Sequence, residues 1–146
     1  MPEGPLTGKV VLVTGGGRGI GRGHCLELAK QGAAVVVNDP GVGRDGSSGD
    51  GAGPAADVVA EIEASGGKAV AHTGSVSAWD DVADMISTAV DTFGSLTGVV
   101  NNAGILRDSM VAAASEADWD AVIAVHLKGT FAVTRHACAY WRAQFK

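Results

Sequence analysis

Short apolar runs recur along the chain and predict four β-strands. They fall at residues 9–13, 34–38, 68–72 and 98–101, and a longer segment with helical spacing follows each of them. The second run is apolar at almost every position, which is typical of a strand buried on both faces of a sheet. Strands that alternate with helices indicate a parallel sheet with right-handed crossovers. We therefore predict an α/β fold with a doubly wound parallel sheet, strand order 3-2-1-4 and flanking helices.

The helices are predicted over residues 20–31, from 54 to the glycine pair at 66–67, from 77 to 93, and from 115 to the end of the chain. Pro54 suits the first turn of a helix because its fixed φ is already helical. The spacing of Ser77 with Asp80, and of Ser115 with Asp118, resembles a capping box and predicts a helix start at each serine. The second helix is expected to turn four apolar residues inward, namely Ala56, Val59, Ala60 and Ile62.

The last predicted helix carries large apolar residues at near-helical spacing. Such a face packs either in the core or between subunits, and here it consists of Trp119, Ile123, Leu127, Phe131 and Ala137. A helix that is apolar around much of its circumference needs partners on more than one side. We therefore expect the intact protein to form a homo-oligomer through this helix, with Trp119, Phe131 and Trp141 as candidate contacts.

A glycine-rich turn follows the first strand and is the clearest chemical signal in the chain. Its spacing is T-G-x-x-x-G-x-G, with glycines at Gly15, Gly19 and Gly21 and with Arg18 and Ile20 between them. Glycines let the backbone approach phosphates, and the following helix offers unpaired N–H groups and a positive dipole end. The turn therefore predicts a site for a dinucleotide pyrophosphate, although a flexible turn without a ligand is an alternative.

Asp39 ends the second strand and favours NAD over NADP as the cofactor. A carboxylate at this place can accept hydrogen bonds from the adenine ribose hydroxyls and would repel a 2′-phosphate. The alternative is a turn residue, because Asp39-Pro40-Gly41 is also a turn sequence. The stretch from residue 41 to 53 is longer than usual for such a connection. It is either a surface insertion or a lid over the adenosine end of the cofactor.

The run Asn101-Asn102-Ala103-Gly104 follows the fourth strand. Together with the glycine turn it resembles the short-chain dehydrogenase/reductase family, over essentially the whole chain from Leu6 onward. The resemblance implies a Rossmann-type fold, oxidoreductase activity and a nicotinamide cofactor. In that family this run closes the cofactor pocket and ties neighbouring strands together. Arg18 favours NADP, since members of the family that use NADP often carry a basic residue at this position. Asp39 lies nearer the ribose, and we therefore predict NAD.

The same resemblance assigns further positions. Ser75 and Val76 correspond to residues that contact the adenine, although most members carry Asp where Ser75 stands. Thr97 also replaces a common Asp, which puts one local hydrogen bond in question. His126 stands where most members have the Asn that holds a water in the proton relay. Imidazole can also donate and accept, so His126 is a candidate catalytic residue, and a core histidine is the alternative.

His126, the loop after Asp39 and residues 101–108 narrow the resemblance further. They look like the (3R)-hydroxyacyl-CoA dehydrogenase unit of multifunctional β-oxidation enzymes, and more loosely like 3-oxoacyl-carrier-protein reductases. The resemblance implies hydride transfer between nicotinamide and a secondary alcohol or ketone, such as a 3-hydroxyacyl thioester. A stand-alone nucleotide-binding or interaction module without catalysis is the alternative.

The family's proton transfer uses a Ser, a Tyr and a Lys four residues after the Tyr. The one tyrosine here is Tyr140, and Gln144 stands four residues after it. Tyr140 also precedes the strand that should carry the Ser. We therefore expect residues 1–146 to be the N-terminal, cofactor-binding part of a single dehydrogenase domain whose catalytic part is absent, and to be inactive alone.

Composition limits the partners. A net charge of −5 without a basic stripe argues against nucleic acid. No apolar run approaches the roughly 20 residues that span a bilayer, and no signal peptide is recognised. We expect a cytoplasmic protein with a small-molecule substrate and no membrane partner. Cys25 and Cys138 are expected to be small buried hydrophobes, and His24, His72 and His136 have no metal-ligand spacing.

Overall fold

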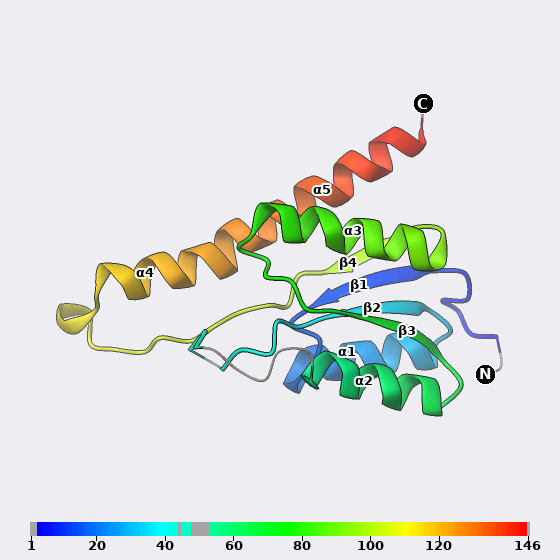
Figure 1. Cartoon of the computed structure of the whole chain (residues 1–146), viewed down its shortest axis with the longest axis horizontal. Coiled ribbons are helices and arrows are strands. Elements are labelled where there is room, and N and C mark those ends of the chain that lie inside the picture. Colours follow the sequence, from blue (N-terminus) through cyan, green and yellow to red (C-terminus); the bar gives the residue numbers. More distant parts are fainter. Residues whose placement is uncertain (1–2, 44, 48–52, 146) are drawn as a thin grey trace.

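The computed structural model describes residues 3–43, 45–47 and 53–145, and its centre is a four-stranded sheet (Figure 1). The strands are β1 (Val10–Thr14), β2 (Ala34–Asn38), β3 (Lys68–His72) and β4 (Gly98–Val100). All neighbours are parallel, and their order is β3-β2-β1-β4. The predicted fold class and strand order are confirmed.

The register aligns the carboxyl ends of the strands. Thr14 pairs with Asn38 and Asn38 with His72, while Val13 pairs with Val100. The chain therefore leaves β1, β2, β3 and β4 at the same edge of the sheet. Successive crossovers run in opposite directions on the two sides of β1, and ligands bind in the crevice that such a reversal creates.

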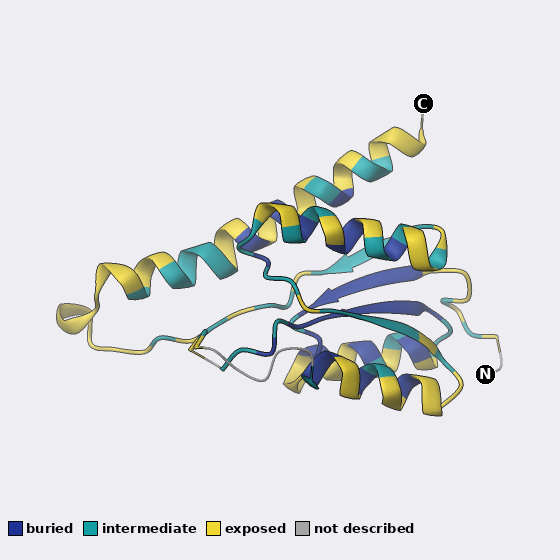
Figure 2. Cartoon of the chain, viewed as in Figure 1, coloured by how far each residue is buried: buried dark blue, intermediate teal, exposed yellow. Residues whose placement is uncertain are grey.

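Helices cover both faces of the sheet, as a doubly wound fold requires. On one face lie α1 (Gly19–Lys30) and α2 (Gly53–Ala64), and on the other lie α3 (Trp79–Phe93) and α5 (Gly129–Gln144) (Figure 1). Successive residues of β1 and β2 point to opposite faces. Because helices cover both faces, every residue of these two strands is buried (Figure 2). The prediction of a strand buried on both sides is confirmed for 34–38.

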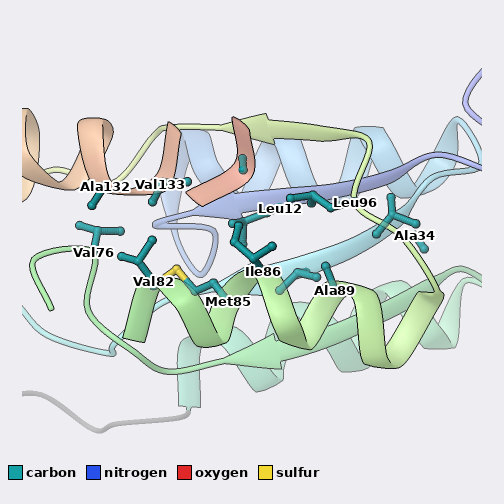
Figure 3. Packing of buried hydrophobic residues seen from close by; sticks show 13 residues of the cluster. Leu12, Ala34, Val76, Val82, Met85, Ile86, Ala89, Leu96, Ala132 and Val133 are labelled. Carbon is teal, nitrogen blue, oxygen red and sulfur yellow. The ribbon is translucent and has the colours of Figure 1, made fainter. Parts of the chain in front are cut away.

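Each face has its own core cluster. Under α3 and α5, Leu12 and Val36 pack with Met85, Ile86 and Val133 (Figure 3). Under α1 and α2, the cluster contains Val13, Val35, Val37, Cys25, Ala29, Val58 and Ile62. These clusters hold the sheet rigid, and the loops at its carboxyl edge are built on that support.

The inward face of α2 differs from the prediction. Pro54, Ala55, Val58 and Ile62 are buried, whereas Ala56 and Ala60 are exposed. The buried stripe starts at Pro54 itself and repeats every fourth residue, which is the spacing of one helix face. Alanine is small enough for either face, so the alanine-rich sequence did not mark the boundary.

One of the two predicted helix starts is wrong. The helix α3 begins at Trp79, and its N-cap residue Ala78 makes no side-chain cap. Ser77 instead shares a hydrogen bond of 2.8 Å with the Ser75 hydroxyl, because it belongs to the preceding loop. The start at Ser115 is confirmed, since its Oγ accepts a hydrogen bond of 3.0 Å from Asp118 N.

The predicted last helix is divided into three parts. These are α4 (Glu116–Ile123), a π-helical segment η2 (Ala124–Lys128) and α5. A short 3₁₀ turn, η1 (Val111–Ala113), lies before the predicted start of this helix. The segment from residue 105 through α4 extends past the end of the sheet, and most of it is exposed (Figures 1 and 2).

Most large residues on the apolar face of this helical stretch are therefore not buried in the core. Trp119, Leu127 and Phe131 are 67%, 65% and 60% exposed, while Ala137 is buried. The core interpretation fails for the three large residues because α4 and the start of α5 lie beyond the strands. Trp141 packs against the protein's own core and donates a hydrogen bond of 2.7 Å to Leu96 O. A subunit contact through Trp119 and Phe131 stays a prediction.

Three smaller expectations have clear outcomes. Cys25 is buried as expected, but Cys138 is exposed because it follows the buried Ala137 onto the outer side of α5. Thr97 keeps the local bond that was in question: its hydroxyl accepts from Val10 N at 2.8 Å and donates to Val10 O at 3.0 Å. Within the described residues, no helix is both long and apolar enough to traverse a bilayer.

Candidate functional site

A cleft of about 690 Å³ lies at the carboxyl edge of the sheet. It is lined by segments that follow all four strands and by the end of α4 with the start of η2. Every residue predicted to contact the cofactor lies in this lining: Gly15, Arg18, Gly19, Ile20, Gly21, Asp39, Ser75, Val76, Asn102, Ala103 and Gly104. Residues far apart in the sequence thus converge on one cleft large enough for a small-molecule ligand.

The glycine turn gives the cleft its floor. Gly15 has a φ of +63°, and a Cβ built on it would lie 2.9 Å from Ala103 Cα. Only glycine fits both the left-handed backbone and this close approach. The turn leads directly into α1, whose N-cap residue Arg18 has no side-chain cap. The first N–H groups of α1 therefore have no side-chain acceptor at the cap, which is the arrangement that receives an anion.

A cross-tie between Thr14 and Asn102 joins β1 to the segment after β4. The buried Thr14 hydroxyl accepts hydrogen bonds of 3.1 Å from both Asn102 N and Ala103 N. In return, Asn102 Nδ2 donates to Thr14 O at 3.1 Å and to Gly15 O at 3.0 Å. We call these four bonds the Thr14–Asn102 tie. It fixes the glycine turn against the N-N-A-G run, one on each side of the crevice.

Asp39 is held rigidly at the end of β2, with only 8% of its surface exposed. Its Oδ2 accepts a hydrogen bond of 3.0 Å from Gly17 N, and its Oδ1 accepts one of 2.8 Å from Gly41 N. The carboxylate therefore connects the glycine turn to the loop after β2. Each oxygen keeps further acceptor capacity, and the residue lines the cleft.

The loop after β3 forms another wall of the cleft. Asn38 Nδ2 donates a hydrogen bond of 2.8 Å to Gly74 O, and Gly74 N donates one of 3.1 Å to His72 Nδ1. Ser75 N donates to Asp81 Oδ2 at 2.9 Å. These bonds anchor the loop at both its strand and its helix side. They also bring the Ser75 and Val76 positions into the same cleft as Asp39.

His126 lies in the π-helical segment η2 and is exposed, so the alternative of a core histidine is wrong. Its Nε2 lies 2.8 Å from Ile105 O and 3.1 Å from Ile105 N. His126 does not line the cleft itself but is bonded to the backbone of Ile105, which does. Single-turn π segments often occur at functional sites, and this one aims the imidazole at the end of the N-N-A-G run.

Cys25 lies beneath the glycine turn and serves as packing. A Cβ on Gly16 would lie 2.8 Å from the Cys25 sulfur. Burial raises the pKa of the Cys25 thiol to about 12. At neutral pH the group therefore stays an uncharged thiol and is not a nucleophile.

Several lining or organising residues were not predicted from the sequence. Thr14 opens the glycine motif, but the cofactor contacts expected there were the three glycines, Arg18 and Ile20. Arg107, together with Val42, Gly43 and Gly46, also lines the cleft. Arg107 stands three residues after Gly104, and its charge there was a usable signal. Nothing in the glycine-rich stretch shows which residues face the site. Within the described part of the chain, no cluster of His, Cys, Asp and Glu could hold a metal ion.

This fold and the place of the cleft define an α/β protein of the Rossmann type. The short chain dehydrogenase family matches residues 9–146. The chain is 50% identical over 137 residues to peroxisomal multifunctional enzyme type 2 of Mus musculus and 48% identical over 145 residues to hydroxyacyl-CoA dehydrogenase ChsB1 of Mycobacterium tuberculosis. These alignments cover 94% and 97% of this chain. A crystal structure of a short chain dehydrogenase from Mycobacterium avium superposes with a TM-score of 0.88, at 59% identity over 96% of this chain.

The chain therefore belongs to the short chain dehydrogenase family, a family of oxidoreductases that use nicotinamide cofactors. It spans 18% and 43% of the two curated relatives, and 48% of the M. avium chain. The family resemblance predicted from the glycine turn and the N-N-A-G run is confirmed, including the likeness to hydroxyacyl-CoA dehydrogenases.

The Thr14–Asn102 tie predicts the effect of removing one hydroxyl. Thr14→Val keeps the shape of the side chain but leaves the N–H groups of Asn102 and Ala103 without their acceptor. We expect the free energy of unfolding to fall by about 1–3 kcal/mol, measured by urea denaturation of the intact protein. Thr92→Val, at an exposed position of α3, is the matched control and should change it by less than about 0.5 kcal/mol. Equal stability of the two variants would contradict the tie.

Proposed function

We propose that this chain is the cofactor-binding part of an NAD(H)-dependent oxidoreductase that acts on a secondary alcohol or ketone. The observation that carries the proposal is the convergence of the glycine turn, Asp39 and the N-N-A-G run on one cleft. When bound, the nicotinamide cofactor supplies the hydride donor or acceptor. The residues of this chain hold it: the glycine turn and the start of α1 receive the pyrophosphate, and Asp39 accepts from the ribose hydroxyls.

Two contacts support NAD rather than NADP. The Asp39 carboxylate is held by Gly17 N and Gly41 N, so it cannot easily turn away from a 2′-phosphate. Arg18 Nη1 donates a hydrogen bond of 3.0 Å to Val42 O, which directs the guanidinium toward the loop after β2 and leaves its positive charge in place. A carboxylate fixed at the proposed ribose site disfavours a second negative group there.

The substrate class rests on the relatives. One is a hydroxyacyl-CoA dehydrogenase by name, and this chain is 48% identical to it. We propose a 3-hydroxyacyl thioester as substrate, with His126 at the relay position beside Ile105. No Tyr-x-x-x-Lys pair occurs in residues 1–146, so we expect this part alone to bind cofactor without turnover.

The test of this function is the oxidation of 3-hydroxyacyl-CoA by the intact protein, followed by NADH absorbance. We expect NAD-dependent turnover, and none from residues 1–146 alone, because general acid–base assistance contributes about 10²–10⁴-fold and is missing there. An intact protein that binds NADH but oxidises no hydroxyacyl thioester would refute the substrate class. Turnover by a homogeneous preparation of residues 1–146 would refute the missing proton transfer.

Removing the Asp39 charge should change the cofactor preference. In Asp39→Ala the ratio of NADPH to NADH dissociation constants should fall by about tenfold, since repulsion of the phosphate is lost. NADH itself should also bind more weakly, because Gly17 N and Gly41 N lose their acceptor. Asp57→Ala, on the exposed side of α2, should leave the ratio unchanged. Tighter binding of NADPH than NADH to the unaltered protein would overturn the assignment.

We further propose that the intact protein associates through α4 and α5. Trp119 and Phe131 are more than half exposed on these helices, and burying such aromatic surface is a strong driving force for association. Phe131→Glu should shift the molar mass measured by light scattering at micromolar concentration toward the monomer. Val111→Glu, at an exposed apolar residue outside both helices, should not. A monomeric unaltered protein would contradict the proposal.

A further inference from the structure

The described residues of the loop after β2 lie on one side of the cleft, and Val42, Gly43 and Gly46 line it. We call residues 41–43 and 45–47 the strap. Three backbone donors fold it on itself: Gly43 N donates to Ser47 O at 2.9 Å, Gly46 N to Gly43 O at 2.9 Å, and Ser47 N to Asp45 Oδ1 at 2.9 Å. The strap begins at Gly41, whose N–H is bonded to Asp39. It is thus a compact turn attached at one end to the proposed ribose-binding carboxylate.

Arg107, in the segment after β4, attaches the strap to the opposite side of the cleft. Arg107 Nε donates a hydrogen bond of 2.8 Å to Asp45 O. Its Nη1 donates to Asp118 Oδ1 on α4 at 3.3 Å. The Ser115 hydroxyl, and then Arg107 itself, hold the pKa of Asp118 below its ordinary value. Asp118 therefore stays ionised at neutral pH and keeps the guanidinium oriented toward the strap.

A second arginine joins the strap to the glycine turn. Arg18, at the start of α1, donates to Val42 O at 3.0 Å. The strap therefore connects the glycine turn after β1 with the segment after β4, across the crevice between them. Figure 1 shows this crossing, where the trace after β2 meets the trace that leads from β4 to α4. Val42, Gly43, Gly46 and Arg107 line the same cleft as the glycine turn.

We propose that Arg107 is a positioning residue that holds the strap across the cofactor cleft and so retains the bound dinucleotide. The proposal rests on the proposed function for its ligand. The hydrogen bonds of Arg107 to Asp45 O and Asp118, which we call the latch, are a property of the protein alone. Arg107 acts through the strap, since its guanidinium is used by Asp45 O and Asp118. Without Arg107 the strap loses its hydrogen bond to the segment after β4, while its bonds to Asp39 and Arg18 stay.

The test is the rate of NADH release from the intact protein, measured by stopped-flow displacement. Arg107→Ala should raise this rate about tenfold, the loss expected for one charge-assisted hydrogen bond. The association rate should change much less, because contacts that close after binding act on release. Arg22→Ala is the matched control: it removes an exposed arginine–carboxylate pair with Glu61, outside the cleft lining, and should leave the release rate unchanged.

A second readout does not need the cofactor. In the unliganded protein, Arg107→Ala should speed hydrogen exchange at the amides of Gly43, Gly46 and Ser47, while Arg22→Ala should not. Gly46→Val disturbs the strap itself, because a Cβ at this position would lie 3.2 Å from Ile105 Cδ1. This variant should also release NADH faster, and it keeps the proposal testable if Arg107→Ala does not fold.

The outcomes separate the two proposals. If the unaltered protein binds neither NADH nor NADPH, the proposed function and cofactor retention both fail, and the exchange rates still decide whether Arg107 latches the strap. If NADH binds, and both Arg107→Ala and Gly46→Val release it at the unaltered rate, the retaining role of the strap is refuted. Unchanged exchange of the three amides in Arg107→Ala refutes the latch.

Discussion

The cleft depends on one small set of hydrogen bonds, the Thr14–Asn102 tie. A parallel sheet leaves a gap between β1 and the chain after β4, because the crossovers diverge there. The Thr14 hydroxyl and the Asn102 carboxamide bridge that gap with four bonds of 3.0–3.1 Å, all to or from backbone groups. The Thr14 side chain is buried, and a buried polar group that loses its partner costs more than an exposed one. The glycine turn is thereby fixed relative to the segment that follows β4.

The rest of the site is built outward from this tie. Asp39 links the glycine turn to the strap, and the strap is bonded in turn to Arg18 and Arg107. Each of these side chains bonds mainly to backbone atoms of another loop. Such contacts position loops on the rigid sheet and leave the cleft itself free for a ligand. The charged residues around the cleft thus have a structural use as well as any use toward a cofactor.

Most of this arrangement could be predicted because its signals are local. The apolar runs at 34–38 and 9–13, and the glycine spacing at Gly15, Gly19 and Gly21, determine strand order and cleft position through general rules of parallel sheets. What escaped prediction depends on contacts between distant segments. Nothing in the sequence around Arg107 indicates that Asp45 O is its partner. The apolar spacing of α4 and α5 likewise gives no sign that Trp119 and Phe131 stay exposed.

Thr14 and Asn102 act together to shape the cleft, which we propose binds a dinucleotide. This joint role is tested most directly by NADH affinities of the intact protein with Thr14→Val, Asn102→Ala and both substitutions combined. If the two side chains form one unit, the second substitution adds little to the first, and the interaction energy should be about 0.5–3 kcal/mol. Effects that add to within about 0.3 kcal/mol, or substitutions without effect on NADH affinity, would contradict a joint role of Thr14 and Asn102 in cofactor binding.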